Sequence, residues 1–479
     1  MKDTRSYIKQ YLAKNKALFQ RISEYIYQHP ETRFEEYESS RFLASECEQE
    51  GFIVERGVAD METAFVATYG SGSPIIGFLG EFDALSGLGQ EPNETEYKPV
   101  KVDVGHGCGH NLLGTGSLAA AFAVKSYIEA NGLSGTVKFF GCPGEEGGSG
   151  KTFMVREGVF DEVDAALTWH PSPANAIMSL SSLANYQIAF KFKGIPSHAA
   201  NSPHLGRSAL DAVELMNVGV NYLREHIIPE ARLHYAVTNT GGISPNVVQA
   251  NAEVLYLIRA PKVTQVDEIY QRVCEIAEGA AKMTGTELGI NFDKACSNYI
   301  PNRKLESLLY NHMQELGIEQ PTDKEKAFAE KIWSSLTDVE KGGYLEVIKG
   351  FGYGGDGSEF AGKYLSDSIA EYEPTEGILP GSTDVSDVSW VVPTAQLTAS
   401  TSALGTPLHT WQMTSQGISS YAHKGMLRAA GAMALTSLQL LLNPSELIEV
   451  KQEFHAFREK HPYRCPIPNH VQPSKLEEG

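Results

Sequence analysis

The sequence predicts an α/β protein with an inserted α+β domain, and two patterns carry this prediction. Apolar runs typical of buried strands alternate with helical patterns in the first part of the chain, which favours a mostly parallel sheet. From about Tyr186 the pattern changes to alternating strands and two helices. A chain of 479 residues is also too long for one ordinary core. We therefore predict one domain formed by residues 1–184 and 298–479 and an inserted domain over residues 185–297.

The first domain is predicted to begin with helices and to continue with alternating strands and helices. Apolar residues at helical spacing from Ile8 to Ile26 predict one long amphipathic helix. The run PIIGFLGEF, Pro74–Phe82, is continuously apolar and therefore typical of a buried strand. Further elements are expected as helices over 39–48 and 111–132 and strands over 52–54, 135–143 and 164–171.

The inserted domain begins with the alternating run NYQIAFKFKG, residues 185–194, which predicts a strand. The elements expected after it are a helix over 208–227, strands over 234–242 and 252–261, and a helix over 266–285. This order fits the ferredoxin-like split βαβ motif. Beyond this domain, a charged helical stretch around 305–341 is followed by the Gly-rich run FGYGGDGSEF, which we predict to be a surface loop.

Composition restricts the class of protein. Hydrophobic residues make up 42% and charged residues 21%, as in ordinary soluble globular proteins. A net charge of −19 argues against nucleic acid or an anionic membrane as the main partner. The start of the chain is polar, no apolar run approaches a membrane span, and the six cysteines show no disulfide pattern. We therefore expect a cytoplasmic protein with reduced thiols.

The run GCPGEEGGSGKT resembles a phosphate-binding loop at first sight. Gly150, Lys151 and Thr152 supply the end of the pattern G-x-x-x-x-G-K-[ST], but its first glycine position holds Glu145. Glu145 and Glu146 would also place two negative charges where phosphates bind. We therefore reject the nucleotide-binding interpretation.

The run GHGCGHN places His106, Cys108 and His110 at alternate positions. A thiolate beside imidazoles favours a divalent ion such as Zn²⁺ or Mn²⁺. The alternative is a Gly-rich turn with incidental histidines and a buried cysteine. A closed structural zinc site is disfavoured because no second Cys/His cluster with zinc-finger spacing occurs.

Acidic and histidine side chains follow the predicted strands. Asp83, Glu145, Glu146 and His170 all fall at or just past strand ends, which meet at one edge of a parallel sheet. One carboxylate of the Glu pair can bind a metal ion while the other takes a proton from a water. The alternative for an isolated pair is a solvated acidic turn.

Other polar residues say little by themselves. A lone histidine at a strand end, such as His170, is more often structural, and His409 in a predicted loop is uninformative alone. His198 and Arg259 fall in the inserted domain. Arginine suits the recognition of a carboxylate, although a surface ion pair is its ordinary role.

Six motifs in one order resemble the aminoacylase and carboxypeptidase-G-like family of metallopeptidases and amidohydrolases. They are GEFDALSG, GHGCGHNLLGT, GCPGEEGGSGK, TWHP, SHAA and GTPLHTWQ. The Cys-x-His form of the metal motif is similar to the amidohydrolase branch, and the resemblance spans essentially the whole chain. It implies a phosphorylase/hydrolase-like catalytic domain, interrupted by a ferredoxin-like lid that also dimerises.

The resemblance implies a site with two divalent metal ions, Mn²⁺ being favoured and Zn²⁺ the alternative. The positions that match the family's metal ligands are Cys108, His110, Glu146, His170 and His409. Glu145 matches the general base, and Asp83 matches the acid that orients a neighbouring ligand. In the lid, His198 matches a histidine that reaches the active site, in several relatives that of the partner subunit. Asn246 and Arg259 match residues that hold the substrate carboxylate or the oxyanion.

The activity that the resemblance implies is hydrolysis of the amide bond of an N-acyl amino acid, with p-aminobenzoyl-glutamate the leading substrate. Another N-acyl amino acid, such as indoleacetyl-aspartate, or a dipeptide remains open. A second alternative is a non-catalytic subunit that supports a homologous partner. We expect either a homodimer or a heteromer with a homologous subunit.

Overall fold

The computed structural model describes residues 4–475, which form two compact units. The first unit contains the chain up to Ser181, Ile300–Leu379 and Asp387–Arg464. The second unit contains Ser182–Tyr299, Pro380–Ser386 and the chain from Cys465 on. The last two of these segments differ from the sequence prediction, which places them in the first domain.

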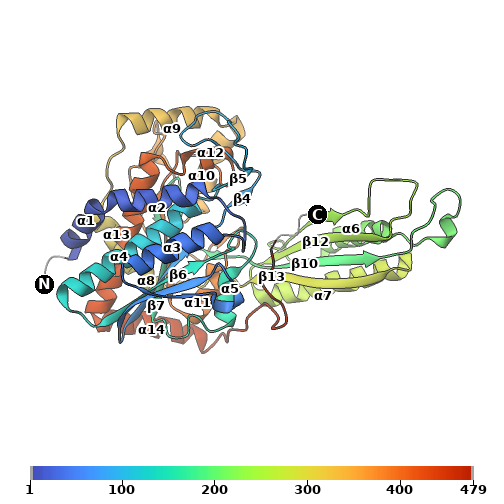
Figure 1. Cartoon of the computed structure of the whole chain (residues 1–479), viewed down its shortest axis with the longest axis horizontal. Coiled ribbons are helices and arrows are strands. Elements are labelled where there is room, and N and C mark those ends of the chain that lie inside the picture. Colours follow the sequence, from blue (N-terminus) through green and yellow to red (C-terminus); the bar gives the residue numbers. More distant parts are fainter. Residues whose placement is uncertain (1–3, 476–479) are drawn as a thin grey trace. The chain divides into compact units, whose positions relative to one another are not determined.

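A sheet forms the centre of the first unit (Figure 1). It has seven strands in the order β1-β2-β6-β3-β7-β15-β8. Its strands are β1 (Ile53–Arg56), β2 (Phe65–Ser71), β3 (Ile75–Glu81), β6 (Gly135–Cys142), β7 (Ala165–Ser172), β8 (Ala176–Ile177) and β15 (Thr394–Ser400). The four central strands β6, β3, β7 and β15 are parallel, and the outer pairings β1–β2, β2–β6 and β15–β8 are antiparallel. The predicted mostly parallel sheet is confirmed at its centre. Strand β15 was not predicted, because three of its buried residues are polar and interrupt the apolar run that marks a buried strand. They are Thr394, Gln396 and Thr398.

The N-terminal pattern forms two helices, so the prediction of one long helix was wrong. Helix α1 (Thr4–Lys14) ends at Asn15, and α2 (Lys16–Gln28) starts directly after it. The Asn15 side chain donates to the Tyr11 carbonyl at 2.9 Å, and its backbone leaves the helical region at φ −99° and ψ 12°. An asparagine side chain that hydrogen-bonds to the backbone competes with helical pairing in this way.

Helix α4 (His110–Asn131) packs unusually close to the sheet, and this closeness places its first residue at the strand ends. A Cβ atom at Gly114 would lie 2.5 Å from the Glu81 carbonyl oxygen, so only glycine fits there. The indole Nε1 of buried Trp169, on β7, donates to the Leu113 carbonyl at 3.0 Å. The glycine-containing start of α4 therefore fixes His110 beside β3 and β7.

Helix α13 (Ser420–Leu442) is long and apolar enough to cross a membrane by length and composition, a feature that the sequence analysis does not identify. It lies inside the protein core, however, because 83% of its most apolar window is buried. It packs against α4 and β15 in the first unit (Figure 1). These features are those of a core helix.

The chain between the second unit and β15 adds helices to the first unit. They are α8 (Arg303–Leu316), α9 (Asp323–Ser335) and α10 (Asp338–Lys349). Capping boxes begin α9 at Thr322 and α10 at Thr337. The Gly-rich run after α10 is not simply a surface loop, because Tyr353 and Phe360 are only 2% and 3% exposed. Short α5 (Gly150–Arg156), α11 (Val385–Val391), α12 (Trp411–Gln416) and the longer α14 (Pro444–Arg458) complete the helices used below.

The second unit contains a four-stranded antiparallel sheet in the order β11-β12-β10-β13. The elements are β10 (Ala184–Lys193), α6 (Ala209–Leu223), β11 (Arg232–Asn239), β12 (Asn251–Ala260), α7 (Val263–Thr284) and β13 (Glu287–Cys296). Buried and less buried residues alternate along β10 and β12, and both helices pack on these strands. The order βαββαβ is that of the ferredoxin-like motif predicted from the sequence.

Glu306 on α8 is a buried carboxyl with an altered pKa. Its side chain is fully buried, and it accepts hydrogen bonds from the Tyr372 hydroxyl at 2.8 Å and from Arg303 at 3.1 Å. Burial raises the pKa of Glu306 to about 7, although Arg303 partly opposes this effect. The folded chain therefore holds a proton here that the unfolded chain has already lost near neutral pH.

Replacing Glu306 with glutamine is expected to flatten the pH dependence of stability. Between the ordinary Glu pKa and about 7 the folded state binds more protons than the unfolded state, so stability falls as pH rises. The shift from 4.5 to about 7 is about 2.5 pKa units, or roughly 3 kcal/mol, and E306Q should remove roughly 1–3 kcal/mol of this fall. Thermal unfolding of wild type and E306Q at about pH 5 and about pH 8 measures this pH dependence of stability. If stability falls equally with rising pH in wild type and E306Q, the raised pKa of Glu306 is contradicted.

Candidate metal centre and active site

The carboxyl ends of the parallel strands gather most of the predicted site residues at one edge of the sheet. Asp83 follows β3 by two residues, and Glu145 and Glu146 follow β6 in a tight turn. His170 lies near the end of β7, and His110 begins α4. Neighbouring parallel strands end side by side, so residues far apart in sequence meet there.

The segment that follows α2 packs against the glycine-rich turn after β6. Phe34, at the left-handed φ of 60°, lies beneath the turn, where a Cβ atom at Gly144 would be 2.8 Å from its ring. The Glu36 carboxylate accepts the Gly144 N–H at 2.9 Å. A Cβ atom at Gly150 would lie 2.0 Å from the Pro143 carbonyl oxygen, so the turn closes only with glycine there. This packing explains why two glutamates sit among glycines.

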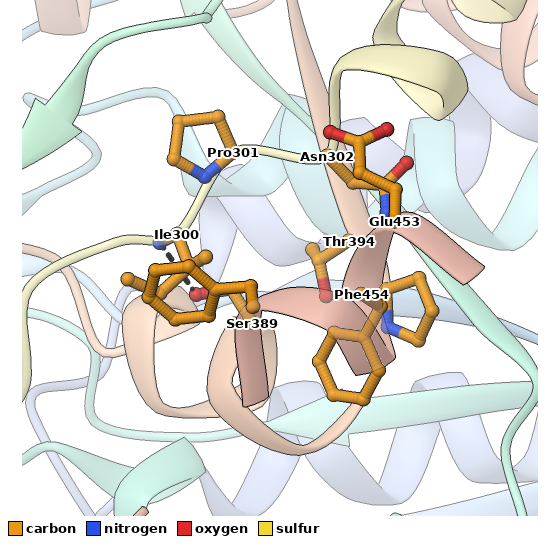
Figure 2. A pocket seen from close by; sticks show the side chains of 9 residues that line it. Ile300, Pro301, Asn302, Ser389, Thr394, Glu453 and Phe454 are labelled. Carbon is orange, nitrogen blue, oxygen red and sulfur yellow. Dashed lines mark hydrogen bonds between the residues drawn. The ribbon is translucent and has the colours of Figure 1, made fainter. Parts of the chain in front are cut away.

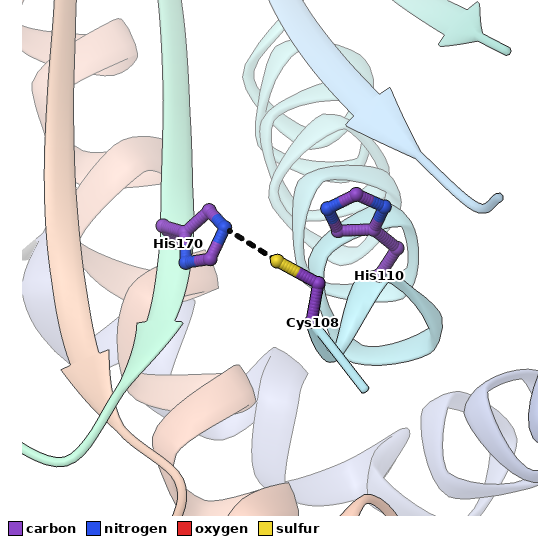
Figure 3. A group of neighbouring side chains, drawn as sticks. All are labelled: Cys108, His110 and His170. Carbon is purple, nitrogen blue, oxygen red and sulfur yellow. Dashed lines mark hydrogen bonds between the residues drawn. The ribbon is translucent and has the colours of Figure 1, made fainter. Parts of the chain in front are cut away.

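Two groups of potential metal ligands share Cys108. Sγ of Cys108 lies within 4.8 Å of ligand atoms of His110 and His170, and it also lies within 4.8 Å of ligand atoms of Glu146 and His409. Figure 3 shows Cys108 between His110 and His170, with its sulfur 3.4 Å from Nε2 of His170. Two adjacent three-ligand positions with one shared thiol are the arrangement expected for two ions that lie close together.

Hydrogen bonds fix the ring nitrogens of the two buried histidines. Nδ1 of His110 donates to Oδ1 of Asp83 at 2.9 Å, and Oδ2 of the same carboxylate accepts the Glu146 N–H at 2.7 Å. Nδ1 of His170 donates to the Pro171 carbonyl at 2.7 Å. Because each Nδ1 carries a proton, each Nε2 has its lone pair available for a metal ion. Asp83 therefore contacts two of the predicted ligand residues, His110 and Glu146.

His409 is held in an uncommon backbone conformation. Its φ is 59°, and its N–H donates to the Gly107 carbonyl at 2.8 Å, which ties its loop to the run that contains Cys108. Nε2 lies 3.1 Å from Oε1 of Glu146. Although 263 residues separate them in sequence, His409 and Glu146 are therefore neighbours.

The surroundings favour the charged forms of Glu146 and His409 and the neutral form of the Cys108 thiol. Burial would raise the pKa of Glu146, but the hydrogen bond with His409 and the nearby His110 outweigh it and lower this pKa to about 2. The same hydrogen bond raises the pKa of His409 above its usual value. Burial and then Glu146 raise the pKa of the Cys108 thiol. A coordinated divalent ion reverses that last effect, because a coordinating thiol is deprotonated.

The donor set fits divalent transition-type ions. It combines sulfur, imidazole nitrogen and carboxylate oxygen, which suit Zn²⁺ and, for the nitrogen and oxygen donors, Mn²⁺. Nε2 of buried His110 makes no hydrogen bond within the described chain, although Oε2 of Glu81 is 3.3 Å away. A buried nitrogen without a hydrogen-bond partner destabilises the folded state unless another partner, such as a metal ion, binds it.

His106, the third ligand-type residue of the GHGCGHN run, is a structural residue. It is 1% exposed, and its Nε2 donates to the Ile26 carbonyl of α2 at 3.1 Å. Burial lowers its pKa to about 3, so it stays neutral. Its ring ties α2 to the turn before α4 and takes no part in either ligand group.

Glu81 and Lys151 are buried charges at the site that the sequence analysis did not predict. Nζ of Lys151 lies 2.8 Å from Oε1 of Glu81, and the side chains are 0% and 3% exposed. Glu81 also forms a third potential ligand group with His110 and Glu145. The available signal was an acidic residue at the end of a strand, two positions before Asp83 and hence on the same face.

The remaining predicted residues belong to the second unit, where His198 and Asn246 are neighbours and Arg259 is distant. The Ala199 N–H donates to the Asn246 carbonyl at 2.9 Å, next to a bridge between His198 and Val247. Arg259 lies near the opposite end of β12 and donates to the Ser382 hydroxyl at 3.1 Å.

A cavity of about 210 Å³ in the first unit is separate from the ligand groups (Figure 2). Phe454 and Phe457 of α14 line it together with Glu453. The Glu453 carboxylate accepts the N–H groups of Arg303 and Lys304 at 2.7 and 2.8 Å, so it caps the start of α8. None of the predicted site residues lines this cavity.

Comparison with known proteins places these features in context. Residues 77–401 match peptidase family M20/M25/M40. The chain is 54% identical over 461 residues to one of the subunits of the p-aminobenzoyl-glutamate hydrolase of Escherichia coli, with 95% of this chain and 96% of that protein covered. It is 28% identical to the Xaa-Arg dipeptidase of Mus musculus, over 90% and 88% of the two chains. The YXEP protein of Bacillus subtilis, a dinuclear metal-binding peptidase of the M20 family, has the same fold, with a TM-score of 0.53, 16% identity and 90% and 99% coverage.

Proposed function

We propose that this chain cleaves p-aminobenzoyl-glutamate to p-aminobenzoate and glutamate. The chain belongs to peptidase family M20/M25/M40 and is a metal-dependent amide hydrolase. The family resemblance drawn from the sequence motifs is confirmed. The proposed substrate rests on the 54% identity to the E. coli hydrolase protein over nearly the whole of both chains.

The observation that best supports catalysis by this chain itself is its complete set of ligands beside a separate carboxylate. Cys108 joins the two ligand groups, and Glu146 is engaged with His409. Glu145 belongs to neither of these two groups, but its Oε2 lies 4.0 Å from Nε2 of His110, with which it forms the third potential group. A subunit with only a supporting role has no need of a second carboxylate at this position.

The proposed reaction uses Glu145 as a proton carrier. Two divalent ions, which we propose to be Mn²⁺ with Zn²⁺ as the alternative, supply Lewis-acid polarisation of the carbonyl and lower the pKa of a water when bound. Glu145 takes a proton from the attacking water as the water oxygen bonds to the amide carbon. Glu145 then gives that proton to the nitrogen as the C–N bond breaks, so the products are a carboxylic acid and an amine.

We propose that His198 donates a hydrogen bond to the oxyanion that develops on the carbonyl oxygen. Nδ1 of His198 accepts the N–H groups of Ala200 and Asn201 at 3.2 and 3.1 Å. Its proton is therefore on Nε2, and the side chain is exposed. An exposed ring with a fixed Nε2–H is suited to stabilising a negative oxygen.

The geometry of the second unit supports an assembly of at least two subunits. Arg259 is eight residues beyond Asn251 on β12, which is about 26 Å at about 3.3 Å per residue, whereas His198 and Asn246 lie near the Asn251 end. A small substrate cannot contact both ends of one strand. We propose that Arg259 holds the glutamate carboxylate in one subunit, while His198 and Asn246 serve the site of a partner.

An exposed edge strand is available for that partner. Strand β11 lies at the edge of its sheet, and Tyr235 and Val237 on it are 40% and 41% exposed. An exposed strand edge with apolar side chains favours pairing with another chain. The partner is either a second copy or a homologous subunit, since the E. coli relative is named as one subunit of a hydrolase. We also propose a cytoplasmic location, which the six free cysteines support.

The proposed substrate is tested with the purified chain, supplied with Mn²⁺, on p-aminobenzoyl-glutamate, indoleacetyl-aspartate and a small dipeptide panel. We expect kcat/KM for p-aminobenzoyl-glutamate to exceed the others by at least about 10-fold, roughly 1.4 kcal/mol of transition-state preference. Preference for another conjugate would keep the reaction and replace the substrate. Metal-loaded chain that hydrolyses nothing until a homologous subunit is added would favour the supporting-subunit alternative.

A further inference from the structure

The Gly-rich segment Phe351–Phe360 brings an aromatic ring against a predicted metal ligand. The rings of Phe351 and His170 are stacked, with centroids 5.6 Å apart and planes inclined by 25°. Both side chains keep part of their surface exposed, whereas Trp169, one position before His170, is 1% exposed. Phe351 therefore packs on a predicted ligand ring that keeps part of its surface exposed, 181 positions along the chain from it.

The segment itself, and not the burial of the ring, fixes the position of Phe351. The backbone of Gly352 has φ +90°, and a Cβ atom there would lie 2.2 Å from the Ile177 carbonyl oxygen. Tyr353 is 2% exposed, accepts the Gly357 N–H at 2.9 Å on its hydroxyl, and packs on Phe360 with centroids 5.1 Å apart. A partly exposed phenyl ring held by an ordered segment is pre-organised to contact a ligand.

The chemistry of the exposed surface restricts what it contacts. A phenyl ring offers a flat apolar face without a hydrogen-bond donor or acceptor, so it suits a flat apolar group and not a carboxylate. An N-acyl glutamate with an aromatic acyl group has two carboxylates and one ring. Of these groups, only the acyl ring matches Phe351.

We propose that Phe351 is a specificity-determining residue that contacts the aromatic acyl group of the substrate while the scissile amide lies at the metal centre. This inference rests on the proposed function and names the part of the substrate that the segment recognises. Its second contact, with His170, requires a test that separates recognition of the acyl group from support of a metal ligand.

The test compares wild type, F351A, F351L and F360L, all supplied with Mn²⁺. Two quantities are measured: kcat/KM for p-aminobenzoyl-glutamate and the inhibition constant of N-acetyl-glutamate, which has the same amino acid but no ring. For F351A we expect kcat/KM to fall about 10-fold, chiefly through KM, the equivalent of about 1.4 kcal/mol. The inhibition constant should change less than about 2-fold, and bound metal should stay at the wild-type amount. F351L should give an intermediate loss, since it keeps apolar volume but no aromatic face.

F360L serves as the control, because Phe360 packs in the same segment but is buried on Tyr353. Any effect of loosening the segment should appear in F360L on both compounds alike. Equal losses for both compounds in F351A, loss of bound metal, or unchanged kinetics would each overturn the specificity role. A wild-type chain that does not hydrolyse p-aminobenzoyl-glutamate would refute the proposed function and this inference together, whereas an active wild type with insensitive variants would refute the inference alone.

Discussion

Replacing Glu145 with glutamine is expected to lower kcat by roughly 100- to 10,000-fold while leaving the bound metal unchanged. Glutamine keeps the size of the side chain but cannot take a proton from water. Glu145 is in neither group that contains Cys108 and belongs only to the third group, with Glu81 and His110, while Phe34 and Glu36 hold the turn that carries it. The fold of the turn and the metal content should therefore survive the substitution.

Glu146 provides the matched control, because it is the adjacent residue in the same turn. E146Q removes a charged ligand that lies 3.1 Å from His409, so it should reduce bound metal and activity together. Single-turnover rates and elemental analysis of both variants distinguish the two roles. Substantial activity in E145Q, or metal loss equal to that of E146Q, would remove Glu145 as the base.

Replacing Cys108 with alanine is expected to cause the largest loss, because Cys108 belongs to both ligand groups. Substitution of a residue that merely orients a ligand costs about 10- to 100-fold in metal affinity, and the loss of a shared ligand should exceed about 100-fold for both ions. Activity should fall to background at metal concentrations that saturate the wild type. Calorimetric titration of the metal-free chain with Mn²⁺ measures the two affinities.

Cys47→Ala is the control for removing a buried sulfur atom. Cys47 is also fully buried, but it lies on α3 (Tyr37–Gln49) in the apolar core. Without metal, Cys47→Ala and Cys108→Ala should lower stability by similar amounts. Cys47→Ala should keep the wild-type affinity for both metal ions. If Cys108→Ala binds one ion with wild-type affinity, the thiol is not shared between two positions.

The residues that the sequence placed at strand ends come together in the fold for a simple topological reason. Asp83 and Glu146 follow two apolar strands, His170 lies near the end of a third, and the parallel sheet aligns the ends of those strands. Periodicity in the sequence is sufficient to identify such strands and thus their shared edge. For His409, only the family motif gave the placement, since its loop reaches Glu146 across 263 residues.

The features that could not be predicted depend on packing between distant segments. The Glu81–Lys151 pair joins a strand end to the start of α5, and neither residue shows by local pattern that it is buried. Phe351 lies in a run whose glycines suggest a surface loop, yet Gly352 packs against Ile177 of β8, and the Phe351 carbonyl accepts a hydrogen bond from Thr398 of β15. Asn15 breaks the N-terminal helix although the apolar spacing continues through it.

We propose that this chain, by itself, hydrolyses p-aminobenzoyl-glutamate with two metal ions bound at the Cys108 centre. The most direct test of this proposal is to titrate the metal-free chain with Mn²⁺, in the absence of any other subunit, and to follow the initial rate of p-aminobenzoate release. We predict that the rate rises with added Mn²⁺ until about two equivalents per chain are bound, and then stays constant. Binding of Mn²⁺ without release of p-aminobenzoate at any loading would contradict the account.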